Sequence, residues 1–156
     1  GLLTQCNGVS LNSVDGTPYS CEGYRLPTEG EWEYAAKANS EGVYSGSEEL
    51  NPVGWYEGNS SGQIQPVAKK NRNEWGLYDM SGNVWEWVWD GYAAYPNEES
   101  IDPQGEEISS YRIRRGGSVG HLSRYARVAY RVRVDPKFSS YDLGFRIVRT
   151  AVMPDE

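Results

Sequence analysis

The stretch WGLYDMSGNVWEWVWD, residues 75–90, decides the fold, because two signals for local structure follow one another in it. The residues around Gly82 are turn formers set between aromatic side chains, which predicts a tight turn. Trp85, Trp87 and Trp89 then alternate with other residues, and this period of two predicts a β-strand. We therefore expect an aromatic-rich strand that begins directly after a turn.

One α-helix is predicted upstream, in the stretch RLPTEGEWEYAAK. Thr28 is a candidate N-cap residue, and Glu31 stands three residues later, as a capping box requires. Trp32, Ala35 and Ala36 follow the spacing of one helix face and make that face apolar. The sequence therefore predicts one amphipathic helix here.

Length and composition predict one α+β domain that is rich in loops. The chain has 156 residues, of which 38% are hydrophobic, and its 6 Trp and 12 Tyr supply large rings for a core. With 18 Gly and 8 Pro, long loops are expected, including an ordered loop over residues 38–73. Strands of a small antiparallel sheet are expected around Gly116, over 127–134 and over 144–148. The mean hydropathy is −0.70, and no stretch approaches the roughly 18 apolar residues of a membrane helix.

Charge is distributed unevenly along the chain. The formal net charge is −7, yet residues 111–150 carry ten Lys and Arg against two acidic residues, a net charge of +8. The remainder is therefore −15, and the two parts should attract each other. Arginine pairing inside the domain is one interpretation, and a nucleic-acid-binding surface is the other. Because only four of the cations of the chain are Lys, we expect internal pairing and no nucleic-acid partner.

The two cysteines, Cys6 and Cys21, allow two interpretations. They form one disulfide in an exported protein, or they are two unreactive thiols. A zinc site would need more ligands than these two cysteines and the single histidine, His121, supply.

Three parts of the chain together resemble the formylglycine-generating-enzyme (sulfatase-modifying factor) family, whose fold is a variant of the C-type lectin fold. They are GYRLPTEGEWEYAA at 23–36, WGLYDMSGNVWEW at 75–87, and RGGS at 115–118 with LGFR at 143–146. The resemblance implies that residues 1–156 are one C-type-lectin-like domain whose amino-terminal strands and first helix are missing. We therefore expect the carboxy-terminal part of a longer protein, which packs against its own amino-terminal segment.

The resemblance also bears on catalysis. It implies a pair of active-site cysteines in the segment after RGGS, but residues 119–131 contain no cysteine. A related branch of the fold holds non-haem iron with several histidines, and His121 alone cannot form such a site. We therefore expect a protein that is not an enzyme, and the alternative is a formylglycine-generating or related sulfatase-modifying enzyme, active or degenerate.

A calcium site is predicted in the turn that precedes the aromatic strand. Asp79 and Glu86 offer carboxylates on either side of the turn, and oxygen ligands at such close spacing suit calcium. By resemblance, calcium is held by these two side chains and by the backbone oxygens of Gly82 and Val84. The alternative is that Glu86 forms a salt bridge with a framework arginine while Asp79 caps a turn.

Residues 119–142 have an unusual composition. Glu, Gln, Lys, Met and Trp make up 31 of the 156 residues, so about five would be expected in these 24 positions, but only Lys137 is present. Diversity-generating retroelements randomise adenines, commonly in AAC codons, and such codons cannot come to encode these five residue types. The segment thus resembles the variable region of retroelement-diversified proteins, including treponeme-type surface variable proteins with this fold. The alternatives are a chance composition and aromatic residues that simply belong to the core.

The resemblance implies a variable ligand-binding region over about residues 119–142. The predicted contact residues are Gly120, His121, Leu122, Ser123, Arg124, Tyr125, Tyr130, Val132, Arg133, Val134, Phe138, Ser139, Ser140, Tyr141 and Asp142. The four large rings among them, those of Tyr125, Tyr130, Phe138 and Tyr141, are the expected affinity anchors, because rigid rings bind at a low entropic cost. We expect a protein or glycan ligand, and a bacterial cell-surface location through a lipid anchor in the missing amino-terminal segment. A lectin-like accessory domain with an invariant partner is the competing hypothesis.

Overall fold

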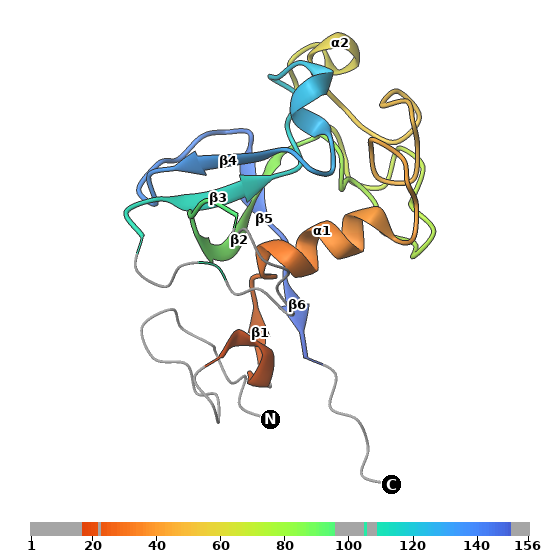
Figure 1. Ribbon diagram of the computed structural model, residues 1–156. Coiled ribbons are helices and arrows are strands. Elements are labelled where there is room, and N and C mark those ends of the chain that lie inside the picture. The colour runs from red at the N-terminus through yellow and green to blue at the C-terminus, as the bar shows by residue number, and fades with distance from the viewer. Residues whose placement is uncertain (1–16, 22, 96–104, 106–108, 151–156) are drawn as a thin grey trace, which may run out of the picture.

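The computed structural model describes residues 17–21, 23–95, 105 and 109–150, and its elements are joined by long loops (Figure 1). The elements are the 3-10 helices η1 (Pro18–Ser20) and η2 (Ser123–Ala126), the helices α1 (Glu29–Lys37) and α2 (Glu57–Ser60), and the strands β1 (Tyr24–Arg25), β2 (Trp85–Gly91), β3 (Arg112–Arg115), β4 (Arg131–Val134), β5 (Leu143–Phe145) and β6 (Val148–Arg149). Within these described ranges, no helix is long and apolar enough to cross a membrane.

Helix α1 forms where the sequence predicts it, and the capping box is confirmed. The Glu31 backbone N–H donates to the Thr28 hydroxyl at 3.2 Å, and the Thr28 N–H donates to the Glu31 carboxylate at 2.8 Å. Arg25 donates two further hydrogen bonds of 2.6 Å to that carboxylate. Burial acts to raise the pKa of Glu31, but these hydrogen bonds and the Arg25 charge outweigh it and lower the pKa. The helix ends where Ala38 adopts a φ of 46° in the left-handed region.

Four strands form the central sheet in the order β4-β3-β2-β5. β3 pairs antiparallel with β2 and with β4, whereas β5 pairs parallel with β2. The predicted small sheet is therefore confirmed, with one parallel pairing at its edge. This pairing arises because residues 135–142 carry the chain from one edge of the sheet to the other, where β5 enters in the direction of β2.

The carboxy-terminal strands are shorter than the sequence predicts. β3 ends at Arg115, because Gly116 and Gly117 adopt φ values of +93° and +74°. Gly117 is also needed for space, since a Cβ atom there would lie 2.8 Å from the Cα atom of Ala126. β4 covers only Arg131–Val134, the second half of its predicted range, and the last predicted strand is divided into β5 and β6.

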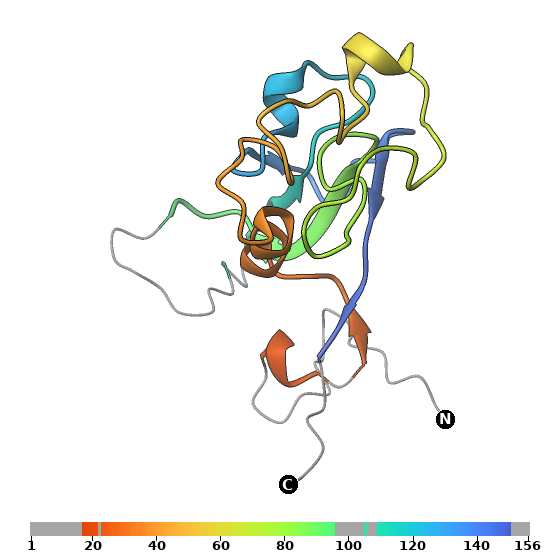
Figure 2. The same cartoon turned by 90° about the vertical axis from the view of Figure 1, so that its right-hand side faces the viewer.

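The sheet has two faces with different surroundings. Glu86, Val88 and Asp90 of β2 are buried on the face that meets α1, which we call the helix face. Side chains alternate along a strand, so the three tryptophans of β2 lie on the opposite face, which we call the outer face. Figure 2, which looks nearly along α1, shows the helix packed to one side of β2.

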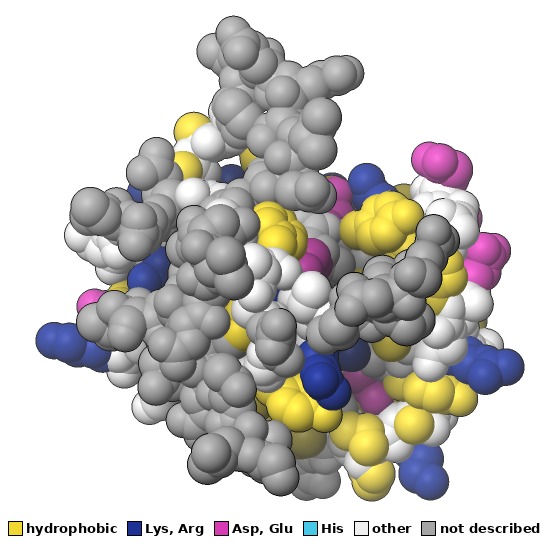
Figure 3. Space-filling model, turned by 90° about the horizontal axis from the view of Figure 1, so that it is seen from below, with side chains coloured by type: hydrophobic (Ala, Val, Ile, Leu, Met, Phe, Trp, Pro, Cys, Tyr) yellow, Lys and Arg dark blue, Asp and Glu magenta, His cyan; other side chains and the backbone are white. Residues whose placement is uncertain are grey.

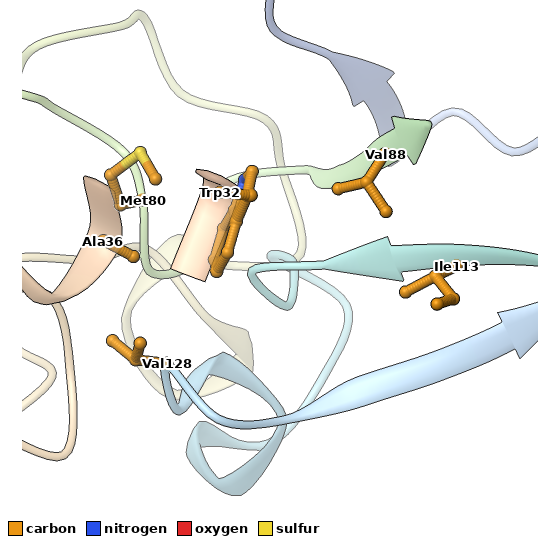
Figure 4. Close-up of a cluster of buried hydrophobic side chains, with 6 residues drawn as sticks. All are labelled: Trp32, Ala36, Met80, Val88, Ile113 and Val128. Carbon is orange, nitrogen blue, oxygen red and sulfur yellow. The ribbon is translucent and has the colours of Figure 1, made fainter. Parts of the chain in front are cut away.

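The main hydrophobic core lies between α1 and the helix face. Trp32 and Ala36 of α1 belong to one buried cluster with Val88 of β2 and Ile113 of β3, and each of the four is at most 2% exposed. Figure 4 shows the Trp32 ring between the helix and the strands. Ala35 packs against this cluster as a partly buried residue. The predicted apolar face of the helix is therefore confirmed.

The predicted ordered loop over residues 38–73 is present and contains only the short helix α2. Tyr44 and Tyr56 pack against a second buried cluster, which includes Leu50 of this loop and Ala126 of η2. Aromatic side chains therefore fix the loop against the end of the domain that carries η2.

Strands β1 and β6 form a separate antiparallel pair below α1, with Tyr24 opposite Arg149 (Figure 1). Cys21 precedes this pair, is fully buried and takes part in a disulfide. The other cysteine of the chain, Cys6, lies outside the described residues. Of the two interpretations of the cysteines, the structure favours the disulfide.

Arginines of the basic segment pair with carboxylates of α1. Arg115 is fully buried and forms a salt bridge with Glu33, and its guanidinium also lies 3.6 Å from Glu29. Arg131 donates hydrogen bonds of 2.8 and 2.6 Å to Glu29. Internal pairing is thereby confirmed for these arginines. Arg114 is one of several arginines of this segment that form no salt bridge with any residue that the structure describes; the others are Arg112, Arg124, Arg127 and Arg133.

Candidate ligand-binding face and cation site

Trp85 is the centre of the candidate ligand-binding face. It begins β2 on the outer face and is only 1% exposed. The His121 ring stands edge-on to it with the centroids 5.4 Å apart, and Trp85 Nε1 donates to His121 Nδ1 at 3.3 Å. The Tyr130 ring lies 6.4 Å away, and the guanidinium carbon of Arg114 lies 4.5 Å from the Trp85 ring centroid. Two residues of the predicted variable region therefore cover a framework tryptophan.

The ring contacts continue outward from Trp85. Tyr125 stands edge-on to His121 and to Tyr130, with centroid distances of 5.6 and 5.1 Å. Phe138 joins through Arg114, whose guanidinium carbon lies 5.5 Å from the Phe138 ring centroid. We call this set the Trp85 cluster, and its members are Trp85, Arg114, His121, Tyr125, Tyr130 and Phe138. The fold thus brings together four predicted contact residues that are up to 17 positions apart in the chain.

The predicted anchors are accessible. Phe138 is 45% exposed and Tyr141 is 65% exposed, while Tyr125 and Tyr130 are half-buried. None of these four rings belongs to the two buried clusters of the described residues, so the alternative that they simply form the core does not hold. A ring that rests on the framework and is partly open to solvent keeps one orientation and still offers contact area.

The smaller predicted contact residues lie in the loops around the Trp85 cluster and in η2. They are Gly120, Leu122, Ser123, Arg124, Ser139 and Ser140. Leu122 is 46% exposed, and the Arg124 guanidinium carbon lies 4.7 Å from the Tyr125 ring centroid. These residues can therefore extend the surface that the rings begin.

Strand β4 divides its three predicted contact residues between the two faces of the sheet. Val132 lies opposite Arg114, so Val132 and Val134 share the outer face with the Trp85 cluster. Arg133 lies opposite the core residue Ile113 and is therefore on the helix face. Arg133 is exposed, but it does not join the other contact residues, and this corrects the expectation from sequence. The reason is the period of two along a strand, which separates neighbours in sequence.

Asp142 is the one predicted contact residue that is buried, with 5% exposure. The Ser118 hydroxyl donates to its Oδ2 atom at 2.5 Å, and the Ser140 hydroxyl donates to its Oδ1 atom. Burial acts to raise the pKa of Asp142, but these two donors and the nearby His121 outweigh it and lower the pKa. Asp142 therefore supports the loop from inside and does not face a ligand, which corrects the expectation from sequence.

A serine, a histidine and an acid meet at this point, but they do not form a hydrolytic site. Ser118 Oγ lies 2.7 Å from His121 Nδ1, and His121 Nδ1 lies 3.6 Å from Asp142 Oδ2. However, Ser118 is 1% exposed and donates its proton to Asp142. A nucleophilic hydroxyl must be accessible and must give its proton to the base. The three side chains therefore hold the loop in place.

Arg114 precedes the predicted variable region and is therefore not among the predicted contact residues. The signal that could have found it is the alternation along β3, where Ile113 is a core residue and its neighbours must face outward. Arg114 of β3 lies opposite Trp87 of the neighbouring strand β2, which places it near the centre of the outer face.

In the predicted cation site, Glu86 already has partners. Its Oε2 atom accepts hydrogen bonds of 2.6 Å from Trp32 Nε1 and from Arg146 Nε. Its Oε1 atom accepts a third hydrogen bond of 2.6 Å from Arg146. Burial acts to lower the pKa of Arg146, but the hydrogen bonds and charge of Glu86 raise it. The salt bridge that was the alternative role for Glu86 is therefore present.

Asp79 offers a free ligand atom at the other end of the same site. Its Oδ2 atom accepts a hydrogen bond of 2.8 Å from the Ala68 N–H, whereas its Oδ1 atom is buried without a hydrogen-bond partner. Such an oxygen can coordinate a cation, although the charge of Asp79 already acts on Arg146. The described residues contain no group of three His, Cys, Asp or Glu side chains that could hold a metal, so Gly82 and Val84 would have to contribute backbone oxygens. The residues fit calcium at Asp79, while at Glu86 the ion would share the carboxylate with Arg146.

Known proteins resemble the chain over most of its length. The family described as "Sulfatase-modifying factor enzyme 1-like domain" matches residues 5–151. The formylglycine-generating enzyme of Streptomyces coelicolor is 36% identical over 165 residues, which cover 92% of this chain and 52% of that protein. Treponema denticola variable protein 1 has a TM-score of 0.81 and 40% identity over 85% of this chain and 50% of that one. PvdO from Pseudomonas aeruginosa has a TM-score of 0.69 and 30% identity, and the match covers 83% of this chain and 54% of PvdO. The chain thus spans about half the length of these relatives.

Proposed function

We propose that this chain, which belongs to the sulfatase-modifying factor enzyme 1-like domain family, is a non-enzymatic member of it and binds a protein or glycan ligand through a variable surface. The observation that carries this proposal is the Trp85 cluster. Its members His121, Tyr125, Tyr130 and Phe138 belong to the segment predicted to vary, and they gather on one face of the sheet. The 40% identity to a protein named as a variable protein supports the same conclusion.

The residues that stabilise the fold are separate from those that would contact a ligand. The core residues Trp32, Val88 and Ile113 lie between α1 and the helix face, and Arg115 forms its salt bridge there. Substitutions among the exposed rings of the outer face should therefore change binding at little cost in stability. A diversified binding surface requires this division of roles.

Two features support a role without catalysis. Residues 119–131, where the resemblance places catalytic cysteines, contain no cysteine, and Ser118 beside His121 is not accessible. The competing proposal is formylglycine generation, which relatives named as that enzyme favour. Incubation of the chain with a cysteine-containing sulfatase peptide, followed by hydrazide trapping, tests it. Aldehyde formation above the level of a buffer control would overturn the non-enzymatic proposal.

A selection experiment with a matched control tests ligand binding. The wild-type chain is presented to a glycan array and to a phage-displayed random peptide library, and the selected ligands are titrated against Tyr130→Ala and Tyr34→Ala. Tyr34 is 65% exposed on α1, away from the outer face, so its substitution makes the same chemical change elsewhere. We expect Tyr130→Ala to weaken binding at least about tenfold, as for an interface anchor, and Tyr34→Ala to leave it unchanged. Equal effects of the two variants would contradict the proposal.

We also propose that a retroelement diversifies the variable region. The support is the composition of residues 119–142 together with the convergence of that segment on the Trp85 cluster. The coding locus should then contain a near-copy of this stretch with AAC at the contact positions, and a reverse transcriptase gene nearby. If strains instead carry near-identical sequences at 119–142, an accessory domain with an invariant partner becomes the better explanation.

An extracellular location at the cell surface, through a lipid anchor, is a further proposal. The disulfide at Cys21 supports the extracellular part, because disulfides persist in oxidising compartments. Protease treatment of intact cells of the source organism should then remove the domain. Protection of the domain in intact cells, with cleavage after lysis, would contradict the proposal.

We propose, too, that an amino-terminal segment like that of the relatives packs against this chain. The relatives are about twice as long, and the face below α1 shows hydrophobic patches beside Lys and Arg side chains (Figure 3). Tyr24 of β1 is 50% exposed, and Ile147, next to β6, is 56% exposed. Amide hydrogen exchange in β1 and β6 should slow in a protein of the relatives' length compared with this chain. Unchanged exchange would refute the contact.

Calcium is the cofactor that we propose for the site at Asp79. The buried, unpartnered Oδ1 atom of Asp79 supports it, and the bidentate contact of Arg146 with Glu86 competes with it. Bound calcium would neutralise the two carboxylates and fix the turn from Asp79 to Glu86, which positions Trp85 at the start of β2.

A further inference from the structure

Arg114 is a half-buried cation without a counter-ion. Its Nε atom is buried and has no hydrogen-bond partner, and its guanidinium forms no hydrogen bond or salt bridge with the described residues. Arg115, the next residue, is fully buried but forms a salt bridge with Glu33. Two adjacent arginines of one strand thus face opposite sides of the sheet, and only the one on the helix face is paired.

Rings hold the Arg114 guanidinium in place. Its central carbon lies 4.5 Å from the Trp85 ring centroid and 5.5 Å from that of Phe138. The nearest acidic influence is Asp142, whose two oxygens are already bonded by Ser118 and Ser140. Cation–π contact orients a guanidinium but leaves its N–H donors unsatisfied.

We infer that Arg114 is a fixed anchor of the ligand site, and that it binds the carboxylate of an Asp or Glu side chain in an acidic protein segment. The inference rests on the proposed ligand-binding function and names the ligand chemistry. A guanidinium fixed against rings presents parallel N–H donors that match a carboxylate in two hydrogen bonds. Burial lowers the pKa of Arg114, and an arriving carboxylate would compensate the lost hydration.

The surroundings of Arg114 favour a protein segment over an acidic sugar. Val132 and Phe138 beside it present aliphatic and aromatic surface. Apolar side chains that flank an acidic residue in a peptide can cover such surface, whereas a sugar needs many hydrogen-bonding partners.

The test uses peptides selected on the wild-type chain from the phage-displayed library. Selected sequences are synthesised with their Asp or Glu and with Asn or Gln instead, and titrated by isothermal calorimetry. The proteins are the wild type, Arg114→Met, Arg114→Lys and Arg72→Met. Arg72 is an exposed arginine in the loop before β2, so its variant controls for loss of one charge. Thermal unfolding of each variant verifies that it is folded.

The acidic peptide should lose at least tenfold in affinity on the change to the amide, and a similar factor with Arg114→Met. The two changes together should cost no more affinity than either alone. Arg114→Lys should lose less affinity for the acidic peptide than Arg114→Met, and the affinity of Arg72→Met should stay within threefold of that of the wild type. Acid-free peptides with equal affinity for the wild type and Arg114→Met would overturn this inference, while sensitivity to Tyr130→Ala would preserve the ligand-binding function. Binding to acidic glycans only would overturn the inference that the ligand is a protein segment. If the wild type retains neither peptides nor glycans, both this inference and the proposed ligand-binding function are overturned.

Discussion

Replacing Asp90 by asparagine should remove most of the pH dependence of stability between pH 5 and pH 8. Asp90 lies on the helix face of β2, is 2% exposed, and accepts a hydrogen bond of 2.5 Å from the Glu29 N–H. Burial raises the pKa of Asp90 to about 7, helped by the charge of Glu29 and opposed by the Glu29 N–H and by Arg131.

The magnitude follows from the difference between the folded and unfolded pKa values of Asp90. The unfolded chain has the ordinary value of 3.8, so above that pH the folded protein binds a proton that the unfolded chain has lost. The free energy of unfolding therefore falls as the pH rises, until the folded group also ionises near pH 7. At about 1.4 kcal/mol per pKa unit, the fall between pH 5 and pH 8 is about 2.5 kcal/mol. Asparagine cannot ionise, and its amide oxygen can still accept from the Glu29 N–H.

Urea unfolding at pH 5, 6, 7 and 8, followed by tryptophan fluorescence, measures this effect. The control is Asp135→Asn, which removes an exposed carboxylate and should keep the slope of the wild type. Glu31 and Asp142 do not interfere, because their pKa values are lowered from 4.5 and 3.8 in the folded protein. The stability that they contribute is present at pH 5 to 8 and is lost mainly as the pH falls below about 4.5. A decline in Asp90→Asn equal to that of the wild type, or no decline in the wild type, would refute the reasoning.

Three further predictions concern the cap of α1, the glycine after β3 and the cation site. Thr28→Ala removes the acceptor for the Glu31 N–H and should lower the free energy of unfolding by about 1 kcal/mol in urea titrations, while an unchanged value would show that the cap contributes nothing. Gly117→Ala should destabilise the protein by more than about 1 kcal/mol, since its φ is +74° and the new Cβ atom would meet the backbone of η2; a stabilised variant would contradict this geometry. Calcium added to protein stripped of divalent ions should raise Tm, and Glu86→Ala should abolish the rise. Arg146→Gln removes the side chain that competes with calcium for Glu86. If Tm does not rise in the wild type or in Arg146→Gln, Glu86 does not bind calcium and its role is the salt bridge.

Local signals in the sequence were sufficient for helix α1. Thr28 and Glu31 satisfy each other's backbone groups within a single turn, and Trp32 and Ala36 lie on one face because of the helical period. These interactions need no distant partner, so the sequence predicts them. Motif order likewise identified the family, and the composition of residues 119–142 singled out the segment that supplies four members of the Trp85 cluster.

Long-range pairing explains what sequence reasoning missed in the fold. The parallel pairing of β5 with β2 depends on how the chain crosses the sheet, which no local pattern records. The partner of Glu86 is Arg146, which is 60 positions away, and the sequence left this salt bridge and calcium as alternatives. Similarly, Asp142 is buried beside Ser118, which comes from another loop and donates a hydrogen bond to it.

The sequence by itself therefore determined the family, the capped helix and the segment from which a binding surface could be built. Only the tertiary structure decided which side chains of that segment share a surface. Strand register turned Val132 toward Trp85 and Arg133 away from it, and it brought Arg114 into the same face from outside the segment. The physical reason is that a face of a sheet is assembled from alternate residues of several strands, so its membership depends on pairings between distant parts of the chain.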